Sequence, residues 1–304
     1  MPHRYHAPPA AVAAGPPFPC WNEVVPATAA FRGYASPVTT ANPSPPPRMP
    51  VLFVGHGSPM NVVEDNRWSR GFRALGGLVP RPRAILAVSA HWYADGSFVT
   101  ANERPETIHD FGGFPEELYR VQYPAPGDPA LARRVVALAG EGRASLATDW
   151  GLDHGTWSVL VHLRPAADVP VVQLSVDARL PPEGHLAIGR ALAPLRDEGV
   201  LILASGNLTH DLRHAFRSMA TGATETPGWA RRFDEAAGAA LERHDDAWLA
   251  GALGTEDGRR SHPTPDHWLP VLYAAGAAAP GEPVRFPVTG FDLSSLSMRS
   301  AIIG

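Results

Sequence analysis

Three histidines in this sequence of 304 residues come shortly after runs of apolar residues. His56 follows VLFVG, His91 follows AILAVSA, and His210 stands four residues beyond VLILASG. Runs of this length that contain Val, Ile and Leu are typical of buried strands in a parallel sheet. Because ligands of such sheets bind beyond the carboxyl ends of the strands, we expect the three imidazoles to share one crevice.

A cluster of imidazoles indicates a metal site, because neutral histidine is the commonest nitrogen ligand of Zn, Fe, Ni and Cu. The chain has a single cysteine, which excludes a site built on several thiolates. Two further histidines qualify: His154 lies in a turn after Asp153, and His267 opens a helix after Asp266. Either aspartate can orient its neighbour by a hydrogen bond, although Asp266 is equally suited to cap the helix.

Most of the other histidines have polar or helix-surface surroundings, or lie near the N-terminus, and we expect no chemical role for them. They are His3, His6, His162, His185, His214, His244 and His262.

Several classes of enzyme are excluded by what the chain lacks. All 26 basic residues are arginine, which rules out Schiff-base, P-loop and Ser–Lys chemistry. No G-x-S-x-G, H-E-x-x-H or G-x-G-x-x-G segment occurs. An α/β-hydrolase, a zincin and a dinucleotide-binding protein therefore have no support.

The apolar runs alternate with segments of helical pattern. This alternation predicts a single three-layer α/β domain, in which a mostly parallel (mixed) sheet is flanked by helices. The predicted strands cover residues 51–54, 84–90, 98–101, 170–177, 200–206 and 283–291. The predicted helices cover residues 66–78, 129–142, 183–199, 229–253 (as one helix or two) and 266–278.

The first part of the chain differs from the rest in composition. Residues 1–48 are rich in Pro and Ala without a periodic apolar pattern, so we expect a disordered tail before a catalytic domain over residues 49–304. The net charge of -4 indicates no affinity for nucleic acid or an anionic membrane. No apolar run reaches the roughly 18–20 residues of a membrane span. We expect a cytoplasmic protein that acts on small molecules.

Several segments are familiar when they are taken together and in order. They are LFVGHGSPMNVVEDN, SAHW, TIHDFGGFPEELYRVQYPAPG, WGLDHGTWSVL, QLSVD, ASGNLTHDLR, SHPTPDHWLPVLYAAGA and SLSM. The chain from Met49 to Gly304 thereby resembles the 4,5-DOPA extradiol dioxygenase family, which belongs to the class III (protocatechuate 4,5-dioxygenase-type) ring-cleaving enzymes. The Pro-rich tail is not part of this likeness.

The resemblance implies a role for each of the five histidines already singled out. It implies that His56, His91 and His267 hold the metal, and that His210 is the active-site base, close enough to be a fourth ligand when no substrate is bound. His154 corresponds to a second active-site histidine. The implied metal is Fe(II), with Zn(II) as a possible occupant, and the implied partners are a catechol and O2.

Aromatic residues near the implied ligands are candidates for contact with the substrate ring, although ordinary core packing explains each of them equally well. A further histidine, His109, lies in a loop that we expect to cover the site and to contact a substrate carboxylate. The aromatic candidates are Trp92, Phe111, Phe114 and Trp268.

Two other readings remain open from the sequence. A zinc hydrolase would use the same histidines to activate water, and a metal-binding protein without activity would keep only the ligands. The presence of both His154 and His210, which can serve as an acid–base pair, favours the dioxygenase.

Overall fold

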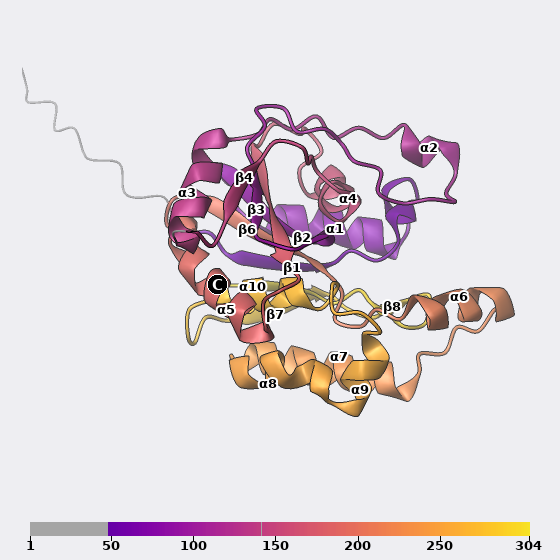
Figure 1. Ribbon diagram of the computed structural model, residues 1–304. Helices are drawn as coiled ribbons and strands as arrows, with labels where there is room; N and C mark the ends of the chain where they lie inside the picture. The colour runs from indigo at the N-terminus through magenta and orange to yellow at the C-terminus, as the bar shows by residue number, and fades with distance from the viewer. Residues whose placement is uncertain (1–47, 141) are drawn as a thin grey trace, which may run out of the picture. The chain divides into compact units, whose positions relative to one another are not determined.

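Eight strands form one sheet in the order β4-β3-β5-β2-β6-β1-β10-β7. Helices lie on both sides of this sheet (Figure 1). The structure is a computed structural model that describes residues 48–140 and 142–304. The strands are β1 Val51–Gly55, β2 Ala84–Ala94, β3 Phe98–Thr100, β4 Ser145–Ala147, β5 Val171–Asp177, β6 Val200–Gly206, β7 Val284–Val288 and β10 Ser300–Ile303. A separate pair consists of β8 Phe291–Asp292 and β9 Leu296–Ser297.

The centre of the large sheet is parallel and its flanks are not. β5, β2, β6 and β1 are parallel neighbours. β3 pairs with β5 in the antiparallel direction, and β10 pairs antiparallel with both β1 and β7. The predicted mixed, mostly parallel sheet is therefore confirmed.

Helices cover both faces of the sheet, as the side-chain alternation of its strands requires. In β1, Val51 and Phe53 pack with the residues of α5 and α10, whereas Leu52 and Val54 pack with those of α1 and α4. The longer helices are α1 Arg67–Leu78, α3 Pro129–Ala139, α4 His154–Leu163, α5 Pro182–Leu192, α6 Leu212–Thr221, α7 Gly228–Glu242 and α10 Leu269–Ala277. The short ones are α2 Glu116–Tyr119, α8 Asp246–Gly251, α9 Glu256–Ser261 and the 3-10 turns η1 Pro59–Val62, η2 Ala193–Arg196 and η3 Ala252–Gly254.

Three details of the sequence interpretation were wrong. β2 does not end at His91 but continues to Ala94, with a shift of register against β5 between Val88 and Tyr93. His154 does not lie in a turn, because it is the first residue of α4. The strand predicted at 283–291 is present as β7, but it is not the last strand, because β10 follows it and is inserted between β1 and β7.

The predicted tail, residues 1–48, lies outside the described residues except for Arg48. This arginine forms an ion pair with Asp197, and the next residue, Met49, is buried. None of the helices in the described part of the chain is long and apolar enough to cross a bilayer.

Candidate active site

The five histidines come together beyond the carboxyl ends of the parallel strands. His56 directly follows β1, and its backbone N–H donates to Gly206 at the end of β6. His91 lies in the last part of β2, and His154 begins α4. His210 follows β6, four residues after the strand ends. Rings on neighbouring strands of a parallel sheet converge in this way because the strands all end at one edge.

Two glycines allow the remaining backbone segments to approach the sheet. A Cβ on Gly206 would lie 2.3 Å from the carbonyl oxygen of His267, which here accepts the N–H of Asn207. A Cβ on Gly155 would lie 2.4 Å from Ser89 Oγ and 2.9 Å from the His91 ring. Side chains larger than hydrogen at these positions would push His267 and α4 away from the site.

The hydrogen bonds of His56 determine which of its nitrogens is free. The hydroxyl of Ser205 donates its proton to the carbonyl oxygen of Gly155 at 2.6 Å. Ser205 Oγ therefore accepts the hydrogen bond from His56 Nδ1 at 2.9 Å. The proton of the neutral ring is therefore on Nδ1, and Nε2 keeps its lone pair.

Asp110 determines the tautomer of two further rings. Its Oδ2 accepts from Nδ1 of His154 at 2.9 Å and lies 3.2 Å from Nδ1 of His91, while Oδ1 accepts the backbone N–H of His154 at 2.8 Å. A carboxylate can only accept, so both rings carry their proton on Nδ1 and have a free Nε2. We had expected Asp153 to orient His154. Asp153 instead caps α4 through Thr156 N–H and bonds to Gln173.

His267 follows the same rule, and His210 differs. Nδ1 of His267 bonds to Asp266, as the sequence suggested, which leaves Nε2 free. The His210 ring is stacked on that of His267, with centroids 3.5 Å apart and planes within 5°. Within the described part of the chain its ring nitrogens have no hydrogen-bonding partner, so His210 is the ring with the most freedom to exchange a proton.

The free nitrogens fit a metal ion better than they fit one another. Nε2 of His56 and Nε2 of His91 are 3.2 Å apart, although both are acceptors. This separation suits two nitrogens that each lie about 2.1 Å from one ion. His56, His91 and His154 form a group in which the possible ligand atoms, one from each ring, all lie within 4.8 Å of one another.

The spacing of the rings makes His267 a second candidate for the third ligand, beside His154. Rings bound to one ion at angles of about 90° to 110° have their centroids about 4.6–5.3 Å apart. The centroids of His56, His91 and His267 are 5.1, 5.3 and 5.0 Å apart. Those of His91 and His154 are 3.7 Å apart. His56, His91 and His267 thus form a nearly equilateral set of rings, and His154 and His210 lie beside it.

Burial keeps these rings neutral. Burial and the neighbouring imidazoles hold the pKa values of His56 and His267 well below the ordinary value. Burial also lowers the pKa of His154, against the opposing effect of Asp110. Burial, and to a smaller extent the charge of His262, lower the pKa of His210 to about 3. The four rings are therefore neutral at neutral pH, which is the form that binds a metal ion.

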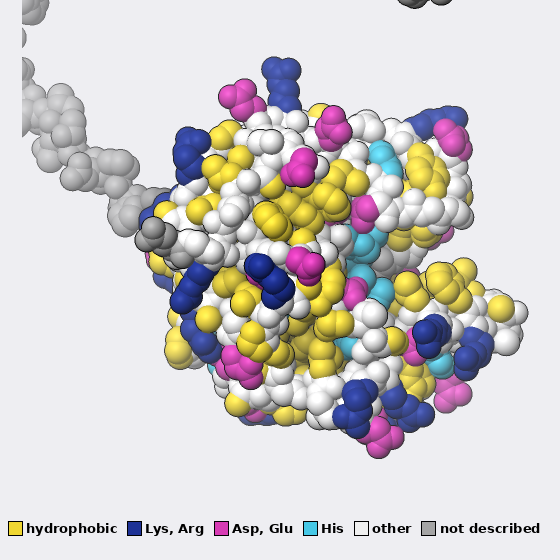
Figure 2. Space-filling model, in the orientation of Figure 1, with side chains coloured by type: hydrophobic (Ala, Val, Ile, Leu, Met, Phe, Trp, Pro, Cys, Tyr) yellow, Lys and Arg dark blue, Asp and Glu magenta, His cyan; other side chains and the backbone are white. Residues whose placement is uncertain are grey.

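A cavity of about 550 Å³ opens over the five histidines. In Figure 2 the histidine side chains lie in a hollow bordered by apolar side chains. Phe111 and Phe114 line this cavity. His109, Trp92 and Trp268 are not among the residues that line it.

The residues outside the cavity have other contacts. Trp268 is fully buried and packs against Phe233 in the core, and Trp92 stacks on Trp150 with centroids 5.3 Å apart. Nε2 of His109 bonds to the carbonyl oxygen of Val121 and so holds the loop that carries Asp110. Sequence reasoning did not single out Asp110 as an orienting residue, since its partners are 19 and 44 positions away. Its only local signal is its place beside His109.

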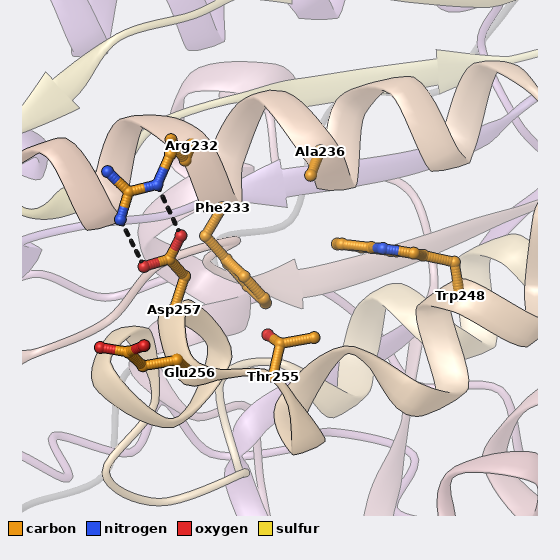
Figure 3. A pocket seen from close by; sticks show the side chains of 7 residues that line it. All are labelled: Arg232, Phe233, Ala236, Trp248, Thr255, Glu256 and Asp257. Atoms are coloured by element: carbon orange, nitrogen blue, oxygen red, sulfur yellow. Dashed lines mark hydrogen bonds and ion pairs between the residues drawn. The ribbon is translucent and has the colours of Figure 1, made fainter.

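A second cavity lies among α7, α8 and α9 and has a different chemistry (Figure 3). Its one arginine, Arg232, forms two hydrogen bonds with Asp257, and Phe233 and Trp248 form its apolar wall. No histidine lines it. The candidate active site is therefore the histidine-lined cavity.

Comparison with known proteins defines the class. The family model described as the catalytic LigB subunit of aromatic ring-opening dioxygenase matches residues 52–296. The chain belongs to this family, and it is an extradiol aromatic ring-opening dioxygenase with a candidate metal site formed by three histidines, His56, His91 and His154.

Individual relatives narrow the class further. The chain is 49% identical over 264 residues to a protein named 4,5-DOPA dioxygenase extradiol from Escherichia coli K12, covering 84% of this chain and 95% of the relative. A protein of the same name from Beta vulgaris is 40% identical, over 75% of this chain and 86% of its own. A crystal structure of the uncharacterized protein JW3007 from Escherichia coli K12 superposes with a TM-score of 0.72 at 43% identity, covering 84% of this chain and all of the other. The family resemblance noted in the sequence is thus confirmed.

Proposed function

We propose that this enzyme opens the ring of a DOPA-like catechol with O2, at the bond between one hydroxyl-bearing carbon and the adjacent carbon outside the diol. Both oxygen atoms of O2 enter the product, which is a muconic semialdehyde. The observation that carries the proposal is the nearly equilateral arrangement of His56, His91 and His267, each with Nδ1 bonded to an acceptor and Nε2 free.

These three imidazoles would hold Fe(II). A bound Fe(II) supplies a path for electrons between catecholate and O2, which redox-inert Zn(II) does not, so a zinc-loaded form would be inactive. Ligands on one face leave room for the two adjacent oxygens of a catechol. Ser205, Asp110 and Asp266 hold the rings in the orientation that this requires.

The two flanking histidines would move the protons. His210 is neutral and has no partner for its ring nitrogens within the described residues, so it can take the proton of the second catechol hydroxyl. The catecholate formed beside it would offset part of the effect of burial on its pKa. His154 presents a free Nε2 and receives orientation from Asp110, and it would assist the later cleavage of the O–O bond by transferring a proton.

Anaerobic reconstitution of the metal-free protein tests this proposal. Portions are loaded with Fe(II) or Zn(II), a panel of catechols is added, and air is admitted while O2 consumption and visible absorption are recorded. We expect a yellow product and one O2 consumed per catechol with Fe(II) only. Equal activity with Zn(II), or turnover without O2, would refute the proposal.

A further inference from the structure

The cavity is larger than a single catechol ring requires. Its volume of about 550 Å³ lies within the range of roughly 300–1,000 Å³ that holds drug-sized ligands. The histidines occupy one part of the lining. The rest of the lining is available to contact a substituent on the catechol ring. The chemistry of that remaining wall indicates what the substituent is.

One wall of this remaining space is apolar and belongs to α6. Leu212, Phe216 and Met219 recur at the spacing of one helical face, and all three line the cavity. They are 41%, 60% and 58% exposed, which is unusual for such large apolar side chains. The arginines of α6, Arg213 and Arg217, are not part of the lining. This face is positioned to cover an apolar linker that extends from the ring.

The charged residues of the lining are all acidic. Besides Asp110, which is bonded to two histidines, they are Glu64 and Asp292. No arginine lines the cavity. The nearby Arg67 stacks on Trp68 and donates to the carbonyl oxygen of Thr289.

Asp292 in particular lacks a counter-charge within the lining. It is partly buried, and Oδ1 accepts the N–H of Leu293 at 3.0 Å. Burial, and to a smaller extent the charge of Glu64, raise the pKa of Asp292. Hydrogen bonds from Leu293 and Trp68 and the charge of Arg67, which lies outside the lining, offset only part of this increase. A cation between Glu64 and Asp292 would relieve both effects, whereas an anion there would add to them.

We infer that the site recognises its catechol by a positively charged amine on an apolar linker, and that it disfavours a substituent whose only charge is a carboxylate. The linker would lie against Leu212 and Phe216 and the ammonium would bind Glu64 and Asp292. This inference rests on the proposed function, because it treats the cavity as the place of the catechol. It also replaces the earlier expectation that His109 contacts a substrate carboxylate, since His109 does not line the cavity.

Three catechols with side chains of similar length and different charge test the inference. They are dopamine, which is cationic, 4-propylcatechol, which is neutral, and 3-(3,4-dihydroxyphenyl)propionate, which is anionic. With the Fe(II)-loaded full chain we expect kcat/KM to fall in that order. The step from dopamine to the neutral compound should be about 10- to 100-fold, the contribution of a charge-assisted hydrogen bond. Equal values, or the highest value for the propionate, would overturn the inference and leave the ring-cleaving function intact.

Substitution of Glu64 and Asp292 tests whether these two acids cause the preference for dopamine. In Glu64→Gln and Asp292→Asn the ratio of kcat/KM for dopamine to that for 4-propylcatechol should fall toward one. Glu117→Gln, an exposed acid of α2 outside the cavity, is the matched control and should keep the wild-type ratio. A wild-type ratio in both acid variants would refute the assignment.

Anaerobic calorimetry with the Zn(II)-loaded protein makes the same comparison without turnover. Tighter binding of dopamine than of the other two compounds supports the inference. If the Fe(II) form nevertheless cleaves none of the compounds, the proposed function is refuted and the inference about amine recognition is not. Equal binding of all three contradicts the inference alone.

Discussion

At the scale of single residues, the site is defined by which nitrogen of each histidine is free. Ser205, Asp110 and Asp266 each bond to an Nδ1 and thereby leave Nε2 as the available ligand atom. Such partners fix the tautomer and the orientation of a ligand ring. Whether a histidine acts as a metal ligand or as a proton carrier then depends on where its ring lies relative to the other histidine rings.

The ligand assignment predicts a clear division among alanine variants. His91→Ala and His267→Ala should lose the bound metal, because each removes one of three ligands. His154→Ala and His210→Ala should keep the metal and lose turnover by about 100- to 10,000-fold, the contribution of general acid–base catalysis. Metal content by mass spectrometry and O2 uptake measure the two properties. Metal loss in His154→Ala with retention in His267→Ala would show that the smaller His56–His91–His154 group is the ligand set.

Asp110 should matter for metal binding although it touches no metal. In Asp110→Asn an NH2 group, which cannot accept a hydrogen bond, replaces one carboxylate oxygen, and the remaining amide oxygen is a weaker acceptor than a carboxylate. The His91 ring therefore loses its fixed orientation. We expect a loss of metal affinity of about 10- to 100-fold, measured by competition with a chelating dye. The control is Asp95→Asn, an exposed residue beyond His91 in the sequence, which should bind metal like the wild type. Unchanged affinity in Asp110→Asn would contradict the orienting role.

At the scale of the elements, the strands deliver His56 and His91, and close approach of other segments completes the site. α4 reaches the sheet only because Gly155 has no side chain to meet Ser89 and His91. The segment before α10 reaches the end of β6 in the same way, through Gly206. The positions of these glycines explain why His154 and His267 join histidines from distant parts of the chain.

Gly155→Ala should therefore disturb the site more than a comparable substitution elsewhere. Its new methyl group would overlap Ser89 and His91, and such overpacking costs about 1–3 kcal/mol. We expect a lower melting temperature and reduced turnover. Gly251→Ala is the control, because a Cβ there meets nothing within 4 Å. If the two variants had equal stability and activity, close approach of α4 would not be a requirement of the site.

Sequence patterns identified the central strands and most long helices, since β1, β5 and β6 are apolar runs on both faces of the sheet. They did not identify β10, because four residues between two antiparallel partners carry little periodic signal. Asp110 was not assigned a role for a different reason. Its hydrogen bonds depend on how a loop folds against α4 and β2, which local spacing does not encode.

At the scale of the whole molecule, a buried histidine outside the active site makes the stability of the fold depend on pH. His185 belongs to α5 and does not line the cavity, and its Nδ1 is 3.0 Å from the hydroxyl of Tyr273 on α10. Burial lowers the pKa of His185 to about 4. The ring is therefore neutral in the folded protein at a pH where the unfolded chain would bind a proton.

The sign of the resulting pH dependence follows from linkage. The pKa of histidine in the unfolded chain is about 6.5. Between this pH and a pH of about 4, the unfolded state binds more protons than the folded state. The free energy of unfolding therefore falls as the pH falls through this range. For this group the loss amounts to about 3 kcal/mol. Urea unfolding of the metal-free protein at a series of pH values measures it. His185→Gln should flatten this part of the curve and His214→Gln should not, and an unchanged slope in His185→Gln would contradict the assignment.

The most direct test of the central claim, that this protein is an extradiol dioxygenase, is the fate of isotopically labelled oxygen. The Fe(II)-loaded protein converts a catechol under ¹⁸O₂, and the product is reduced with borohydride at once so that the aldehyde oxygen cannot exchange with water. We predict a product that contains both labelled atoms and whose carbon skeleton is broken beside the diol. Oxygen derived only from water, or cleavage between the two hydroxyl-bearing carbons, would contradict the account.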